Sequence, residues 1–289
     1  MKVITLFLFL VASSLPNIGF AEATQKVFFS QNTSHIDLSS YIEILPDPDA
    51  SLIIDDIIND KHNFQPISVI GNNFGFSKAA YWVRFTINAD SSTLAPLLLE
   101  LKHPLLDDVR LFIPEGNNRF SVQRTGEMYP FSERDVIHRH YVFNLPIQAT
   151  QESTYYLRLQ TEGSMQIPLF LWSSNAFISH VDTSNLVMGL YYGIMWLLVL
   201  IALSSYLKLR DGLFMTYAFY LISYLFFQSS LNGFSFQFLW YDLPFLSSRA
   251  TSASIGLVVI GGLLFSGNFL QIWSSKHRYI RIIYTLLMA

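Results

Sequence analysis

The sequence predicts an antiparallel β-sandwich followed by a bundle of transmembrane helices. Two observations predict this fold class. Residues 24–185 contain short runs of alternating apolar and polar side chains, separated by Pro, Gly, Asn and Asp, whereas residues 186–289 contain long stretches without a charge. Alternation with a period of two is typical of half-buried strands, and uncharged stretches of about 20 residues are long enough to cross a bilayer.

The charges are divided unevenly between these two halves. The 289-residue chain is only 13% charged, whereas a soluble domain is about 25% charged. Residues 24–185 hold 11 Lys and Arg against 18 Asp and Glu, and residues 186–289 hold 6 against 2. This composition excludes a soluble cytosolic enzyme and a partner role for nucleic acid, and the absence of Cys excludes a disulfide scaffold.

Residues 1–23 are predicted to be a secretory signal peptide. Lys2 precedes an apolar run over residues 3–12, which is too short to span a bilayer, and small residues follow at Ala21 and Ala23. An uncleaved anchor helix is the alternative. In either case the next segment is exported, and residues 24–173 are predicted to form the sandwich as a periplasmic domain. Its strands are expected at residues 81–88, 97–101, 109–113, 120–123, 139–145, 154–160 and 166–172.

The membrane half is predicted to begin after a polar linker at residues 174–186, for which a short helix is the alternative. Basic residues gather at 208–211 and 274–281, whereas the intervening loop holds only Arg249. Because Lys and Arg are enriched in short cytoplasmic loops, we expect a multi-pass protein of the bacterial inner membrane, with its N-terminal domain in the periplasm. Helices are expected at 187–207, 212–231 and 250–273, with a partial helix at 282–289.

Two features of these helices bear on partners and on completeness. Eight apolar residues after Arg281 are too few to cross the bilayer, so we expect a bundle that is cut off in its fourth helix, with a short re-entrant tail as the alternative.

Small residues at Gly189 and Gly193, and at Gly262 and Ser266, permit close helix approach. Packing within one bundle is favoured, and a homodimer is the alternative. The helices are expected to be surrounded by lipid of the inner membrane.

The candidate ligand site comprises Trp82, Arg84, Tyr156 and Arg158. Trp82 and Arg84 project from one face of a predicted strand, as Tyr156 and Arg158 do from another. If the strands are neighbours, two guanidinium groups and two rings line one concave surface. Guanidinium groups bind carboxylates, and flat rings stack on sugars. The alternative places Trp82 in the core and pairs the arginines with surface acids.

No catalytic or cofactor site is expected, because the sequence contains no GxSxG, HExxH or phosphate-binding loop. His138 and His140 share one strand face and form a possible metal pair. Since no third ligand stands at a definable spacing, exposed strand residues are favoured over a metal site. The acidic pairs at residues 47–49 and 55–56 are expected to be solvated turns.

Several motifs resemble one bacterial receptor family. Residues 73–88 (NFGFSKAAYWVRFTIN) and 103–112 (HPLLDDVRLF) are similar to its type 2 extracellular sensor module, and the matching segments continue at 138–145, 155–159 and 167–172. The family is the seven-transmembrane receptors with diverse intracellular signalling modules. Later segments of the chain resemble the start of the family's seven-helix region: GLYYGI at 189–194, Arg210-Asp211 and YAFY at 217–220. Ser204-Ser205-Tyr206 departs from the typical Asn after the first helix.

The resemblance covers roughly residues 35–289 and implies a function. It implies a jelly-roll-like sensor domain, similar to carbohydrate-binding modules, and a helix bundle that signals to a cytoplasmic module. That output is often a diguanylate cyclase or histidine kinase and would lie beyond residue 289, so we expect no enzyme activity in this chain. We therefore expect a sensory receptor for a periplasmic small molecule that is carbohydrate-like or bears a carboxylate.

Two rival functions remain. The first is a membrane-anchored periplasmic adaptor that binds a protein partner, which a flat apolar patch would favour. The second is a glycan-active enzyme, which would need two carboxyl groups facing each other across a cleft.

Overall fold

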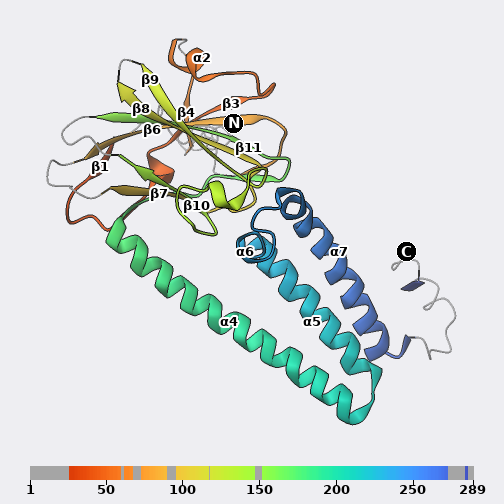
Figure 1. The fold of residues 1–289 in the computed structure, drawn as a ribbon. Helices are drawn as coiled ribbons and strands as arrows, with labels where there is room; N and C mark the ends of the chain where they lie inside the picture. Colours follow the sequence, from red (N-terminus) through yellow and green to blue (C-terminus); the bar gives the residue numbers. More distant parts are fainter. Residues whose placement is uncertain are drawn as a thin grey trace, which may run out of the picture.

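The computed structural model describes residues 26–59, 62–67, 73–89, 96–116, 118–146, 152–272 and 284–285. The predicted signal peptide lies outside these residues, as does nearly all of the partial helix expected at 282–289. In the described part, two large β-sheets and one two-stranded sheet form the N-terminal half, and three long helices extend away from them (Figure 1).

The larger sheet has the strand order β4-β3-β6-β11-β8-β9, and β1 pairs with β6. Only the β1–β6 pair of this sheet is parallel among the described strands. The strands are β1 (Val27–Phe29), β3 (Glu43–Asp47), β4 (Gln65–Pro66), β6 (Ala80–Ala89), β8 (Asp108–Gly116), β9 (Arg119–Thr125) and β11 (Ser153–Gln160).

The smaller sheet has the order β10-β7-β13-β2 and is antiparallel throughout. Its strands are β2 (His35–Asp37), β7 (Leu97–Leu101), β10 (Tyr141–Leu145) and β13 (Leu169–Ser173). A separate pair comprises β5 (Asn73–Phe76) and β12 (Ser164–Gln166), and the short helices are η1 (Leu38–Ser40), α2 (Ile54–Asn59) and η2 (Phe131–Glu133).

One apolar core joins the two sheets. Val83 and Phe85 of β6 belong to the same buried cluster as Leu99 and Leu101 of β7. Successive side chains of a strand point to opposite faces, so alternate residues of each sheet fill the space between them. The predicted fold class, an antiparallel β-fold followed by helices, is confirmed.

Four helices follow the sheets: α4 (Ser174–Leu209), α5 (Gly212–Leu231), α6 (Phe234–Phe238) and α7 (Pro244–Phe269). The segment expected as a linker, residues 174–186, is the first part of α4. Helix α7 begins before residue 250, at Pro244, because proline suits the first turn of a helix. Between α4 and α5, the chain reverses where Arg210 adopts a left-handed conformation and Asp211 accepts a hydrogen bond from Leu213 N.

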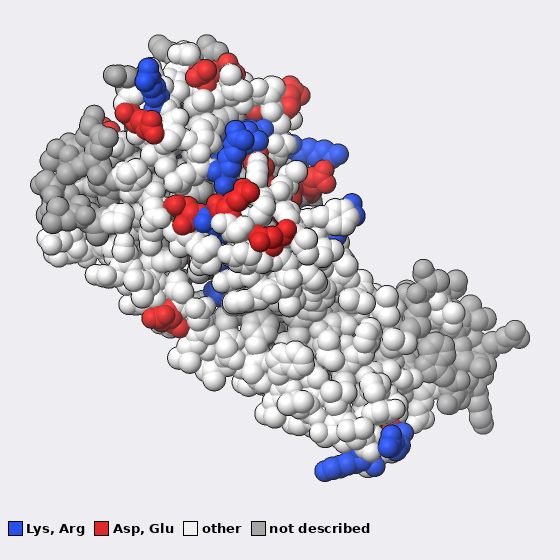
Figure 2. Space-filling view, in the orientation of Figure 1, with Lys and Arg blue, Asp and Glu red and all other residues white. Residues whose placement is uncertain are grey.

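Among the described residues, α4 and α7 are long and apolar enough to cross a membrane. Helix α5 coincides with the predicted helix at 212–231 and contains no charged residue. Figure 2 shows most charged side chains on the β-sheets and at the far tip of the helices, with an uncharged surface between. The chain therefore has the features of a membrane protein.

The small residues noted in the sequence have different surroundings. A Cβ on Gly261 or Gly262 of α7 would meet Tyr220 of α5, so this segment packs within the bundle. A Cβ on Gly189 or Gly193 of α4 would meet no described atom within 4 Å.

Candidate functional site

The four residues predicted to bind a ligand lie on neighbouring strands. In the antiparallel pair of β6 and β11, Arg84 is opposite Tyr156 and Trp82 is opposite Arg158. The apolar residues that alternate with them fill the core between the sheets. All four side chains therefore belong to the outer face of the larger sheet.

Trp82 lies beneath other side chains on that face. It is fully buried, and its ring centroid is 5.2 Å from that of Phe112. Ile57 of α2 and Phe64 complete the same apolar cluster. Trp82 is therefore a packed side chain, as the alternative interpretation of the sequence expected. A ligand does not reach it in this conformation.

Arg158 is also buried, and its donors are bonded within the protein. Its guanidinium donates to Asp108 Oδ2 at 3.2 Å, to Gln160 Oε1 at 3.0 Å and to the carbonyl of Ala50 at 3.2 Å. Burial, together with the nearby charge of Arg110, lowers the pKa of Arg158. These hydrogen bonds indicate a structural role for Arg158 beside Asp108.

Arg84 and Tyr156 are the two members of the set that reach the surface. The guanidinium of Arg84 donates to Glu43 Oε2, with Nε at 2.7 Å, and lies 4.3 Å from the ring centroid of Phe64. The ring of Tyr156 contacts the edge of Phe120 at 5.7 Å between centroids. Arg84 and Tyr156 thus share a half-exposed region of the sheet.

Two hollows meet at Tyr156. The first has a volume of about 310 Å³, and its lining comprises Lys26, Glu43, Arg84, Phe85, Thr86, Thr154 and Tyr156. The second, of about 280 Å³, shares Thr154 and Tyr156 and extends to Glu152 and Arg119. Cations, hydroxyls, carboxylates and aromatic rings are therefore presented together.

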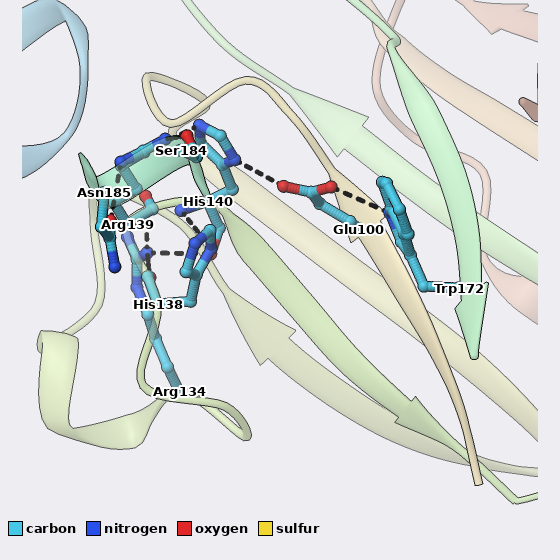
Figure 3. Close-up of polar contacts among 8 residues, drawn as sticks. All are labelled: Glu100, Arg134, His138, Arg139, His140, Trp172, Ser184 and Asn185. Carbon is cyan, nitrogen blue, oxygen red and sulfur yellow. Dashed lines mark hydrogen bonds and ion pairs between the residues drawn. The ribbon is translucent and has the colours of Figure 1, made fainter. Parts of the chain in front are cut away.

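A second cluster lies on the outer face of the smaller sheet and contains Glu100, His138 and His140. Glu100 of β7 is fully buried, and the two histidines directly precede β10. His140 Nδ1 donates to Glu100 Oε1 at 2.6 Å, and Trp172 Nε1 donates to Oε2 at 3.0 Å. Figure 3 shows the Glu100 carboxylate held between His140 and Trp172.

The hydrogen bonds of this cluster indicate the protonation of its groups. Arg139 Nε donates to His140 Nε2 at 3.4 Å, so His140 is a neutral ring with its proton on Nδ1. Burial lowers the pKa of His140, and burial is also the largest cause that lowers the pKa of His138 to about 3. Burial alone would raise the pKa of Glu100, but the hydrogen bond from His140 lowers it. Glu100 is therefore ionised.

Arg139 connects this cluster to the first long helix. Its Nη2 donates to Ser184 Oγ of α4 at 2.6 Å, and its Nη1 donates to Asn185 Oδ1 at 3.4 Å. Its guanidinium also lies 4.8 Å from the ring centroid of Phe234 in α6. The side chain thus joins the smaller sheet to two helices of the bundle.

Arg134 fixes the segment that carries the histidines. Its Nη1 donates to the carbonyls of His138 at 2.7 Å and Arg139 at 3.1 Å. Its guanidinium lies 4.1 Å from the ring centroid of Phe131 and 5.2 Å from that of Phe236. Burial lowers the pKa of Arg134. The position of both imidazoles therefore depends on a side chain that also contacts α6.

Sequence reasoning placed the two histidines together but expected them to be exposed, which is wrong. They are almost buried because the start of α4 covers them, with Phe177 packed at 5.4 Å from the ring of His138. Glu100 was missed as their partner. The one available signal was an acidic residue inside an otherwise all-leucine strand, Leu97–Leu101.

Two family models match the chain in succession. The model described as 7TMR-DISM extracellular 2 matches residues 39–173, and the model described as 7TM diverse intracellular signalling matches residues 184–289. The first match ends where β13 ends, and the second begins inside α4. No curated protein matches the chain.

Similar solved structures include a β-glucuronidase from Ruminococcus gnavus in complex with D-glucuronic acid and the same enzyme in complex with D-glucaro 1,5-lactone. Each has 6% sequence identity and a TM-score of 0.27, and each covers 50% of this chain. The matched part is 30% and 31% of those chains, so this chain spans under a third of their length. A likeness of this extent carries no argument about ligand or activity.

The family assignment thus rests on the two family models, which follow each other in the order of the sheets and the helices. The chain belongs to the seven-transmembrane receptors with diverse intracellular signalling modules, with a type 2 extracellular sensor domain followed by the start of the seven-helix region.

Proposed function

We propose that this chain is the sensing and membrane part of an inner-membrane receptor that binds a small periplasmic ligand beside Arg84 and Tyr156. The observation that carries the proposal is the hollow of about 310 Å³ in which these two side chains meet. The receptor passes the signal through its helices to a cytoplasmic signalling module, which is a partner or follows residue 289.

The chemistry of the hollow favours a ligand that is rich in hydroxyls or bears a carboxylate. Arg84 donates from a fixed position because Glu43 and Phe64 hold its guanidinium. Thr86 and Thr154 place their hydroxyls 2.9 Å apart at the same surface. A sugar hydroxyl can donate to Glu43 and accept from Arg84, whereas a ligand carboxylate must compete with Glu43 for the guanidinium.

Direct binding measurements on the purified full chain test this proposal. Neutral sugars and sugar acids are screened by the rise in unfolding temperature that they cause, and a hit is then titrated. Arg84→Ala should weaken binding about 10- to 100-fold, because a hydrogen bond to a charged group contributes roughly 1.5–3 kcal/mol. Arg124→Ala is the matched control, because Arg124 is an exposed arginine on β9 that does not line this hollow.

A different result would assign Arg84 a structural role. If Arg84→Ala lowers the unfolding temperature while the affinity for the hit stays unchanged, the ion pair with Glu43 serves folding alone. The ligand hollow proposed here would then be rejected.

We further propose that the α4–α5 turn faces the cytoplasm and the β-sheets face the periplasm. This proposal is supported by Lys208 and Arg210 at that turn and by the uncharged stretches at residues 187–207, 212–231 and 250–269. A reporter that works only in the cytoplasm should be active when fused after Lys208 and silent when fused after Asp242. The reverse pattern would reject the orientation.

A further inference from the structure

We propose that Glu100, His138 and His140 form a binding site for a divalent transition metal ion such as Zn²⁺, at the junction of the sensor domain and α4. Each of the three residues offers one ligand atom, and these atoms all lie within 4.8 Å of one another. This site is separate from the hollow at Arg84, which lies on the other sheet, and does not depend on the proposed function.

The ligand types suit such an ion. Two imidazoles and one carboxylate are a known set for zinc, with a fourth position left to water or another ligand. At metal–ligand distances of about 2.0–2.2 Å, tetrahedral ligand atoms lie roughly 3.3–3.6 Å apart. His140 Nδ1 and Glu100 Oε1 are 2.6 Å apart, so shifts of about an ångström in side-chain position would open the site.

The surroundings support the carboxylate in a ligand position. The ring N–H of Trp172 donates to Glu100 Oε2 at 3.0 Å and leaves Oε1 for the ion. Outer hydrogen bonds of this kind orient metal ligands and are part of most protein metal sites. In the present geometry the proton on His140 Nδ1 occupies the place that the ion would take.

Metal binding at this place would change the contact between the sensor and α4. An imidazole that binds a metal through Nδ1 carries its proton on Nε2 and no longer accepts a hydrogen bond there. Arg139 now donates to that nitrogen, while it also holds Ser184 and Asn185 of α4. The ion would therefore displace Arg139 from His140 and alter the side chain that joins the sheet to the helix.

The test uses the purified full chain in detergent, with Co²⁺ as a visible-absorption probe and Zn²⁺ as its competitor. We expect one saturable equivalent of Co²⁺ that Zn²⁺ displaces. Glu100→Gln, His138→Gln and His140→Gln should each reduce the affinity at least 10-fold. His103→Gln is the matched control, because His103 is a partly buried histidine of the same domain that bonds to the carbonyl of Ser164 instead.

Two results would overturn the proposal. The first is a wild-type chain that shows no saturable Co²⁺ binding. The second is binding that persists in His138→Gln but is lost on replacing His35 or His180, which stack on Trp172 and would then hold the ion.

A second measurement, made on the wild-type chain, tests the site even where the variants fail to fold. X-ray absorption at the zinc edge of the wild-type chain should show two imidazoles and one carboxylate around the ion. A coordination sphere with fewer than two imidazoles would also reject the site.

Discussion

Ser247 of helix α7 donates a hydrogen bond to Glu127 of the sensor domain, with 3.3 Å between Oγ and Oε1. Glu127 follows strand β9 and is only 7% exposed. Burial and the neighbouring charge of Asp107 raise its pKa to about 7. The carboxyl group that contacts the bundle is therefore about half protonated near neutral pH.

This contact predicts how stability changes with pH. The raised pKa means that the folded chain keeps a proton that the unfolded chain releases, so stability is lost as pH rises from about 4.5 through 7. At about 1.4 kcal/mol per pKa unit, the loss is up to about 3 kcal/mol. Glu127→Gln should remove this part of the pH dependence, because Gln is uncharged at every pH. Thermal unfolding of the full chain at about pH 5 and about pH 8 measures it, and equal pH slopes in both chains would contradict the assignment.

Gly126 is predicted to be essential for the fold of the sensor domain. Its φ is 144°, and a Cβ there would lie 2.1 Å from the carbonyl oxygen of Asp107. Because that neighbour is backbone, Gly126→Ala should cost more than about 4 kcal/mol or prevent folding. Gly116→Ala is the control, since Gly116 also has a positive φ but a Cβ would meet nothing within 4 Å. It should cost only about 1–3 kcal/mol of backbone strain. Equal losses of stability would show that the close contact at Asp107 relaxes.

The hydroxyl of Tyr141 is predicted to stabilise the loop that precedes β8. It lies 2.8 Å from the carbonyl oxygens of both Pro104 and Leu106 in a fully buried position. Tyr141→Phe leaves these carbonyls without that donor and should lower the free energy of unfolding by about 1–3 kcal/mol. Tyr155→Phe should cost less, because its hydroxyl bonds to one carbonyl, that of Pro146, instead of two. Denaturant unfolding of both variants measures the two losses. An unchanged free energy of unfolding in Tyr141→Phe would show that water replaces the hydroxyl.

The sequence predicted the faces of β6 and β11 because alternation is a local property. Every second residue of these strands packs in the core, so Arg84 and Tyr156 had to share the other face. Alternation did not predict what covers that face. Trp82 is buried by Ile57 and Phe64, which belong to a segment whose packing depends on long-range contacts.

The cluster of Glu100, His138 and His140 could not be predicted either, because it also depends on long-range contacts. Glu100 and His140 are 40 residues apart, and they meet because β7 pairs with β10 in a register that places Glu100 opposite Val142. The predicted strand at 139–145 begins later, at Tyr141, because Arg134 binds the carbonyls of residues 138 and 139. The polar residues 174–186 suggested a linker or a short helix. They form the start of the long helix α4, which covers the outer face of the smaller sheet.

Gly233 is predicted to control the contact between the sensor domain and α6. It has a φ of 76°, and a Cβ there would lie 2.9 Å from both the carbonyl oxygen of Arg139 and the side chain of Pro104. Gly233→Ala should therefore push α6 away from the sensor and break the edge-to-face contact between Phe131 and Phe236, whose centroids are 5.4 Å apart.

A disulfide reports this movement directly, because the chain has no Cys of its own. Ser132 Oγ donates to Asp242 Oδ1 at 2.7 Å across the same contact, so cysteines at these two positions should cross-link readily under mild oxidation. Adding Gly233→Ala should slow the cross-link at least several-fold, since it moves the two cysteines apart. Gly189→Ala is the control, as a Cβ on that glycine of α4 meets no described atom. If Gly233→Ala cross-links as fast as this control, the sensor and α6 move together, and Gly233 serves only the turn before α6.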